Sequence, residues 1–272
     1  IDVDHLYELI TKYFTGTVAI IGTIQFNTAV HQLSRKINKT GTVSATNQGV
    51  SGSLTQATNG TNLSGKDVFH FGSSLSAAVP QIKPLSAGEV LGCTSPIIKY
   101  AQTVIYIGDG RFHLESAMIR NPTLEFHKYC PFSRKLSKEF YDFDKMKTIR
   151  EAEIKKAMKG KSFGIILGTL GRQGNKQIFK NLVEYLGKNY RVYKIVVEEI
   201  NEHILDSFDF VDSFVQVGCP RLSIDWGHNY KKPLLSPFEV YYQGGEYNMD
   251  YYSNEGYGPW KNYNNTGCNE KL

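Results

Sequence analysis

The chain has 272 residues, of which 41% are hydrophobic and 21% are charged, as expected for a soluble globular protein of one large or two small domains. It has no run of eighteen apolar residues, which excludes a membrane-spanning helix, and its apolar content excludes wholesale disorder. The net charge of +5 is too mild to indicate nucleic-acid binding. Because the sequence starts at Ile1 without a signal-peptide pattern, we expect a piece of a longer, cytoplasmic chain.

Short apolar runs alternate with amphipathic patterns along the chain. The amphipathic patterns, which predict helices, cover residues 6–14, 28–37, 138–159, 176–186 and 202–208. The apolar runs, which are typical of buried strands, cover residues 18–24, 104–107, 163–167, 190–197 and 211–217. This alternation predicts an α/β fold with mainly parallel sheets flanked by helices.

Two features divide the chain. Residues 40–65 are mostly Ser, Thr, Gly, Asn and Gln and have little to bury, so we expect a disordered insertion over about residues 40–78. Proline disfavours helix in the residue before it, so we expect a break between two units at Asn121-Pro122. The second unit would then cover residues 122–252, and residues 253–272 would form a tail over the surface.

Four polar loops stand where open α/β sheets place ligands, at residues 92–96, 108–115, 167–175 and 218–227. The third loop opens a helix, so its backbone N–H groups and Arg172 could hold a carboxylate or phosphate. A glycine-rich turn with a solvated arginine is the alternative. The loop lacks both the P-loop ending and the dinucleotide-binding glycine pattern.

The second and fourth loops are dense in charged side chains. These side chains are Asp109, Arg111, His113 and Glu115 in the second loop and Arg221 and Asp225 in the fourth. They would suit acid–base roles, and the alternative is an internal salt-bridge network that supports a turn.

The four cysteines, Cys93, Cys130, Cys219 and Cys268, have none of the close spacings of a zinc finger or a classical cluster motif. Cys93 and Cys219 share a local pattern, since each follows a glycine and precedes a proline within three residues. A thiolate in such a loop is stabilised by helix N-termini and by metal ligation. Two thiolates are too few for a complete zinc or iron–sulfur site, so buried structural cysteines and metal ligands are both open alternatives.

Six blocks of sequence form long motifs in a fixed order: residues 80–96, GDGRFHLESAMIRNP at 108–122, GIILGTLGRQGN at 164–175, CPRLSIDWG at 219–227, and residues 233–239 and 249–252. Together they resemble the diphthamide-synthesis radical enzyme family across nearly the whole chain, apart from the segment at 40–65. The presence of both GCTSP and CPRLSIDWG makes the chain similar to the cluster-bearing first subunit of the eukaryotic heterodimer.

The resemblance implies a non-classical radical enzyme that uses S-adenosylmethionine. In this family three related α/β domains each supply one cysteine to a central [4Fe–4S] cluster. The family transfers a 3-amino-3-carboxypropyl radical from S-adenosylmethionine to a histidine of translation elongation factor 2, the first step of diphthamide formation. The partners implied are that factor, a homologous second subunit and a small iron electron-donor protein, with no membrane and no direct nucleic acid.

Carried over by residue, Cys93 and Cys219 match the second and third cluster cysteines, and the first has no counterpart here. Residues 1–14 then look like the end of a first domain that is largely missing, and residues 15–121 look like the second domain. Cys130 stands where the family more often has Asp, and we do not assign it to the cluster. For S-adenosylmethionine we expect contacts in the central cavity from Gly168, Thr169, Gly171, Arg172, Gln173, Gly174, Asp109, Arg111, His113, Arg221 and Asp225.

Two rival functions differ in class from the radical enzyme. The first is a non-catalytic scaffold subunit that docks elongation factor 2 and the electron donor. The second is a generic nucleotide-binding α/β module without iron. The presence of both Cys93 and Cys219 favours the cluster-bearing subunit over the scaffold.

Overall fold

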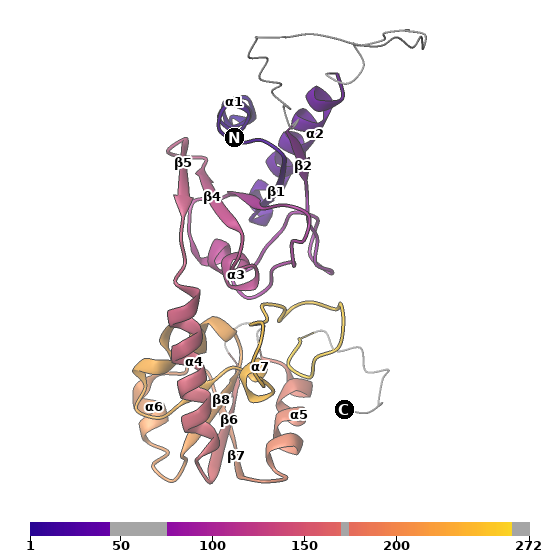
Figure 1. Cartoon of the computed structure of the whole chain (residues 1–272). Coiled ribbons are helices and arrows are strands. Elements are labelled where there is room, and N and C mark those ends of the chain that lie inside the picture. Colours follow the sequence, from indigo (N-terminus) through magenta and orange to yellow (C-terminus); the bar gives the residue numbers. More distant parts are fainter. Residues whose placement is uncertain (44–74, 170–173, 263–272) are drawn as a thin grey trace, which may run out of the picture.

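The computed structural model describes residues 1–43, 75–169 and 174–262. Two α/β units lie one above the other in Figure 1, joined by helix α4 (Phe143–Met158). The mixed α/β fold with mainly parallel sheets flanked by helices confirms the predicted fold class.

The first unit has a five-stranded sheet in the order β2-β1-β3-β4-β5, in which β5 alone is antiparallel to its neighbour. Its strands are β1 (Thr17–Gly22), β2 (Ser76–Ala78), β3 (Thr103–Ile107), β4 (Glu125–Cys130) and β5 (Lys135–Glu139). Alternate residues of β3 point to opposite faces: Ile105 and Ile107 pack with α1 (Val3–Tyr13) and α2 (Asn27–Val43), whereas Val104 and Tyr106 pack with α3 (Phe112–Arg120). A 3-10 turn, η1 (Ile24–Phe26), leads into α2.

The second unit has a four-stranded, fully parallel sheet in the order β7-β6-β8-β9. The strands are β6 (Ser162–Gly168), β7 (Arg191–Val197), β8 (Ser213–Val217) and β9 (Leu234–Leu235). Helices α4 and α5 (Lys176–Leu186) supply side chains to one core cluster of this unit, and α6 (Glu202–Asp206) supplies Leu205 to another. The short helix α7 (Pro237–Val240) follows β9, and at its start Ser236 N–H donates to the Glu239 side chain at 2.7 Å.

The predicted break at Asn121-Pro122 is wrong. Strands β4 and β5 lie beyond it and complete the first sheet, so the sheet of this unit runs to Glu139. Pro122 ends α3 and starts the turn into β4, which is a boundary between elements and not between units. The helix expected from residue 138 begins at Phe143, because the Asp142 side chain accepts the N–H of Lys145 and caps it there.

The ends of the expected insertion are ordered elements. Helix α2 continues to Val43, and β2 begins at Ser76, both inside the range of 40–78. Residues 44–74 of the predicted insertion lie outside the described residues. Residues 1–14, expected to belong to a preceding domain, pack on the first unit: Leu6 and Ile10 are fully buried there.

The tail is held in place as far as it is described. Asn254 N–H donates to the Lys83 carbonyl at 3.0 Å, and Lys83 N–H donates to Glu255 at 2.7 Å. Lys261 forms a buried ion pair with Asp250 at 3.2 Å. The segment therefore ties the end of the second unit to the first. Across the three described ranges, no helix is both long and apolar enough to cross a membrane.

An apolar cluster connects the two units. Ile119 of α3 packs with Ile224, Phe238, Tyr247 and Met249 of the second unit. The backbone adds a direct link beside this cluster, since Ser95 N–H donates to the Met249 carbonyl at 2.8 Å. These contacts hold the loop that contains Cys93 against the second unit.

Candidate functional site: two cysteines between the units

Cys93 lies in a tight turn in which the backbone groups of Leu91 and Thr94 exchange hydrogen bonds of 2.9 and 3.3 Å. The second unit fixes this turn from outside: Tyr251 N–H donates to the Cys93 carbonyl at 3.2 Å, and Tyr252 N–H donates to Thr94 Oγ1 at 2.9 Å. Cys93 is 6% exposed. The turn that carries the Cys93 thiol belongs to the first unit, and backbone N–H groups of the second unit hold it in place.

Cys219 lies immediately beyond β8, before a π-helical turn, η2 (Leu222–Trp226). Its carbonyl accepts the side-chain amide of Gln216 at 2.8 Å and the N–H of Leu222 at 3.1 Å, which fixes the backbone at this point. Turns of π-helix occur frequently at functional sites. The structure therefore places Cys219 on a rigid loop at the end of a central strand.

The two thiols meet although 126 positions separate them in the sequence, and they share a hydrogen bond. As acceptor of that bond, and helped by the N–H and charge of Arg221, Cys219 has its pKa lowered to about 7 despite its burial. The hydrogen bond to Cys219 and burial raise the pKa of Cys93, whose S–H is the donor. The contact therefore favours the thiolate form of Cys219, and thiolates are the form that ligates metals.

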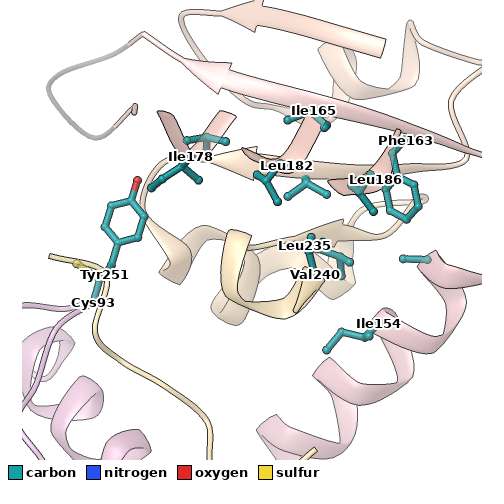
Figure 2. Packing of buried hydrophobic residues seen from close by; sticks show 13 residues of the cluster. Cys93, Ile154, Phe163, Ile165, Ile178, Leu182, Leu186, Leu235, Val240 and Tyr251 are labelled. Atoms are coloured by element: carbon teal, nitrogen blue, oxygen red, sulfur yellow. The ribbon is translucent and has the colours of Figure 1, made fainter. Parts of the chain in front are cut away.

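Apolar residues surround the cysteine pair. Figure 2 shows the Tyr251 ring extending from Cys93 toward Ile178 of α5, and all three belong to the core cluster of the second unit. A cavity of about 10 Å³ beside Cys93, also lined by Pro220 and Asp250, has room for about one water molecule. None of the side chains predicted to line a central cavity lines this one.

Arg221 connects the loop of Cys219 to the first unit. It is 4% exposed, and its guanidinium donates to Asp225 at 2.9 Å, to Glu115 at 2.6 Å and to the carbonyl of Phe112 at 2.7 Å. Its carbon Cζ lies 4.6 Å from the centre of the Phe112 ring. The charged side chains Arg221, Glu115 and Asp225 of the second and fourth loops therefore form the internal salt-bridge network that was one of the two interpretations of these loops.

The other charged residues of the second loop lie at the border of this network. Arg111 belongs to the first unit alone, pairing with Glu115 and Glu139 and donating to the Phe140 carbonyl at 2.8 Å. Asp109 is exposed and accepts the N–H of Gly110 at 2.9 Å.

His113 of that loop has a shifted pKa. Burial and the nearby charge of Arg221 hold the pKa of His113 below its usual range, so its ring is neutral at physiological pH. Among the predicted cofactor contacts that the structure describes, Arg221 and Asp225 carry charges that act on Cys219, whereas Arg111 makes its contacts within the first unit.

The glycine-rich loop is described in part. Gly168 ends β6, and Thr169 N–H donates to the Val197 carbonyl at 2.9 Å. The start of α5 is already capped, because Asn175 Oδ1 accepts the N–H groups of Gln177 and Ile178 at 2.8 and 3.0 Å. Those two amides are therefore not available to the anion expected there. Gly174 packs against Gly168, and the predicted contacts Gly171, Arg172 and Gln173 lie outside the described residues.

Cys130 lies where β4 turns into β5, and its thiol accepts hydrogen bonds from Ser133. Cys268 lies outside the described residues. Within residues 1–43, 75–169 and 174–262, no three His, Cys, Asp or Glu side chains form a metal-binding group. In this part of the chain the cysteine pair thus brings two thiols together without a third such side chain.

Sequence reasoning missed three residues that shape the pair. They are Phe112, which stacks on Arg221; Thr94, whose hydroxyl donates to Cys93 Sγ at 3.8 Å; and Tyr251. Thr94 and Tyr251 stand in the motifs at 92–96 and 249–252, which gave their positions without a role. Phe112 stands in the motif at 108–122, which likewise gave its position without a role.

The fold and the site define a class: an α/β protein of two units with a pair of neighbouring thiols at their junction. The family model described as "Putative diphthamide synthesis protein" matches residues 1–253. The 2-(3-amino-3-carboxypropyl)histidine synthase subunit 1 of Encephalitozoon cuniculi is 51% identical over 97% of this chain, and that of Saccharomyces cerevisiae is 43% identical over 94%. The chain belongs to the diphthamide synthesis family, which confirms the resemblance drawn from the sequence.

Solved structures agree on the fold. The chain superposes on Dph2 from Pyrococcus horikoshii, solved with a 4Fe-4S cluster, with a TM-score of 0.61 at 23% identity, covering 91% of this chain and 64% of that one. A second structure of the same archaeal protein gives a TM-score of 0.60 at 25% identity. The chain spans 67% and 56% of the length of the two subunit 1 relatives named above.

Proposed function

We propose that this chain is the cluster-binding part of a 2-(3-amino-3-carboxypropyl)histidine synthase, in which Cys93 and Cys219 are ligands of a [4Fe–4S] cluster. The complete enzyme would transfer the 3-amino-3-carboxypropyl group of S-adenosylmethionine to a histidine of translation elongation factor 2. One observation carries this proposal: Cys93 of the first unit and Cys219 of the second lie close enough to share a hydrogen bond.

The chemistry of the donors fits an iron–sulfur cluster. The Cys93 side chain is buried and Cys219 is partly buried, and a positive charge at Arg221 favours the thiolate of Cys219. A cubane cluster in proteins takes three or four protein ligands, so two thiols require at least one more cysteine. We propose that the full-length protein supplies it from outside the described residues.

When bound, a reduced cluster would supply the electron needed to cleave the bond between sulfur and the γ-carbon of S-adenosylmethionine, with methylthioadenosine as the leaving group. The new bond to the histidine ring carbon would replace a C–H bond, whose hydrogen leaves as a proton and one electron, so the overall transfer would be redox-neutral. The residues of this chain have simpler tasks. Cys93 and Cys219 would bind iron, and the Tyr251 ring would keep water from the Cys93 sulfur. Neutral His113 lies at the same junction and could accept a proton there.

A scaffold subunit without chemistry is the second candidate. It would need no pair of buried thiols in contact, and in a structural role such cysteines behave as small apolar residues. A thiol whose pKa is lowered to about 7 is not the expected property of such a residue. The homologous second subunit, the iron electron donor and a cytoplasmic setting belong to the same proposal.

The test uses the full-length protein, co-expressed with its second subunit and reconstituted anaerobically with iron and sulfide. Transfer of radiolabel from carboxyl-labelled S-adenosylmethionine to elongation factor 2 is the readout. We expect Cys93→Ser and Cys219→Ser to abolish transfer and Cys130→Ser to retain it. Transfer at the unaltered rate by both of the first two variants would favour the scaffold.

A further inference from the structure

From this geometry we infer that Phe112 and Arg221 form a positioning bridge that sets the separation and orientation of the two cysteine turns. The purpose of the bridge rests on the proposed function, but the bridge itself is a property of the metal-free protein. Neither residue is proposed to touch iron or substrate. Each would act through the turn that it holds.

The first contact of the bridge lies between the Phe112 ring and the turn of Cys93. A Cβ atom placed on Gly92 would lie 1.9 Å from Phe112 Cε1 and 2.6 Å from Cζ. The ring edge therefore occupies the space where any other residue would carry its side chain. Since Gly92 directly precedes Cys93, the ring sets how closely this turn approaches α3.

The second contact joins the same ring to the loop of Cys219. The Arg221 guanidinium lies over the ring face at 4.6 Å, and it donates to the Phe112 carbonyl at 2.7 Å. Arg221 is two residues from Cys219, and its backbone N–H reaches the Cys219 sulfur. One aromatic residue thus contacts the neighbour of the first cysteine and a near neighbour of the second.

The guanidinium is held from both units, so the bridge is rigid. Glu115 of α3 accepts a hydrogen bond from Arg221 Nη2 at 2.6 Å. Both carboxylate oxygens of Asp225 in η2 accept from Arg221 Nε, at 2.9 and 3.0 Å. A lysine could keep the positive charge but not this planar set of donors or the stacking on the ring. Arg111, which shares Glu115, makes its contacts within the first unit and holds neither cysteine turn.

The bridge predicts the behaviour of the metal-free, full-length protein toward phenylarsine oxide. This reagent condenses with two neighbouring thiols to give one dithioarsenite and one molecule of water. Peptide mapping by mass spectrometry would report the arsenic link between the peptides of Cys93 and Cys219. We expect efficient capture in the unaltered protein and at least a tenfold lower capture rate in Arg221→Lys and in Phe112→Leu.

Matched controls separate positioning from general stability. Arg134→Lys changes a surface arginine that pairs with Asp2 at 2.6 Å, and Phe132→Leu changes a ring that is 75% exposed. Both should leave the capture rate unchanged. Phe112→Tyr keeps the aromatic ring, so it should retain the capture that Phe112→Leu loses. Melting temperatures measured on the same samples identify any variant that fails to fold.

Unchanged capture in Arg221→Lys and in Phe112→Leu would overturn the bridge. The capture assay tests the bridge independently of the cluster, because it contains no iron. If Cys93→Ser and Cys219→Ser retained transfer while the bridge variants lost capture, the proposed function would fail and the bridge would stand.

Discussion

Replacement of Gly92 by alanine tests how the Cys93 turn is positioned. The new methyl group would lie 1.9 Å from Phe112 Cε1, whereas ordinary contact begins at 3.4 Å, so the ring edge must withdraw by about 1.5 Å. Phe112 is 45% exposed and has room to swing outward. We therefore expect a destabilisation of about 1 kcal/mol, at the low end of the range for overpacking.

The displaced ring would also leave the Arg221 guanidinium, with the loss of a cation–π contact worth about 0.5–2 kcal/mol. The two costs together predict a loss of about 1.5–3 kcal/mol in urea unfolding, with a large loss of arsenical capture between Cys93 and Cys219. Gly110→Ala is the matched control, since a Cβ atom at Gly110 meets nothing within 4 Å. It should change neither measurement.

A double-mutant cycle makes this reasoning refutable. In a Phe112→Leu background the ring that clashes with the new methyl group is gone, so Gly92→Ala should have a much smaller further effect on capture. If Gly92→Ala lowered capture by the same factor in both backgrounds, the ring would not be what connects the two cysteine turns.

Three further predictions concern the frame around the site. Arg150→Met should cost about 3–5 kcal/mol in urea unfolding, because it leaves Glu239 buried without the guanidinium that now binds it at 2.6 and 3.0 Å; Glu239→Leu added to it should recover part of the loss. Backbone N–H groups at the start of β6 hold the pKa of Asp212 below its usual range, so Asp212→Asn should lower the melting temperature at pH 7, with a difference that disappears as the pH falls below about 4. Hydrogen bonds from Ser133 lower the pKa of Cys130, so Ser133→Ala should slow iodoacetamide alkylation of Cys130 at pH 7, and an unchanged rate would contradict that cause.

The sequence predicted well what depends on local patterns. The helix over 176–186 matches α5 in both bounds, and the strand expected at 163–167 is the interior of β6. The unit boundary failed because Pro122 marks a real end of helix, while the strands beyond it join the first sheet through long-range pairing. Pairing between distant segments leaves little trace in composition.

In the site, too, the sequence predicted the features that depend on local pattern and missed those that depend on contacts between the units. The shared local pattern of Cys93 and Cys219 made them a candidate pair, and the structure brings them into contact. The role of Arg221 was not predictable, because its partners Phe112 and Glu115 lie in the other unit. The sequence of a charged loop is the same kind of pattern whether its side chains bind a ligand or pair with one another, so the pattern does not distinguish the two.

Iron content is the most direct test of the central claim that Cys93 and Cys219 hold a cluster. The full-length protein and its Cys93→Ala, Cys219→Ala and Cys130→Ala variants would be reconstituted anaerobically, and iron and sulfide per chain would be determined together with the absorption spectrum. The account predicts four irons per chain in the unaltered protein and in Cys130→Ala, as a [4Fe–4S] cluster requires, and strong loss of iron in the other two variants. An intact cluster spectrum in both Cys93→Ala and Cys219→Ala would contradict it.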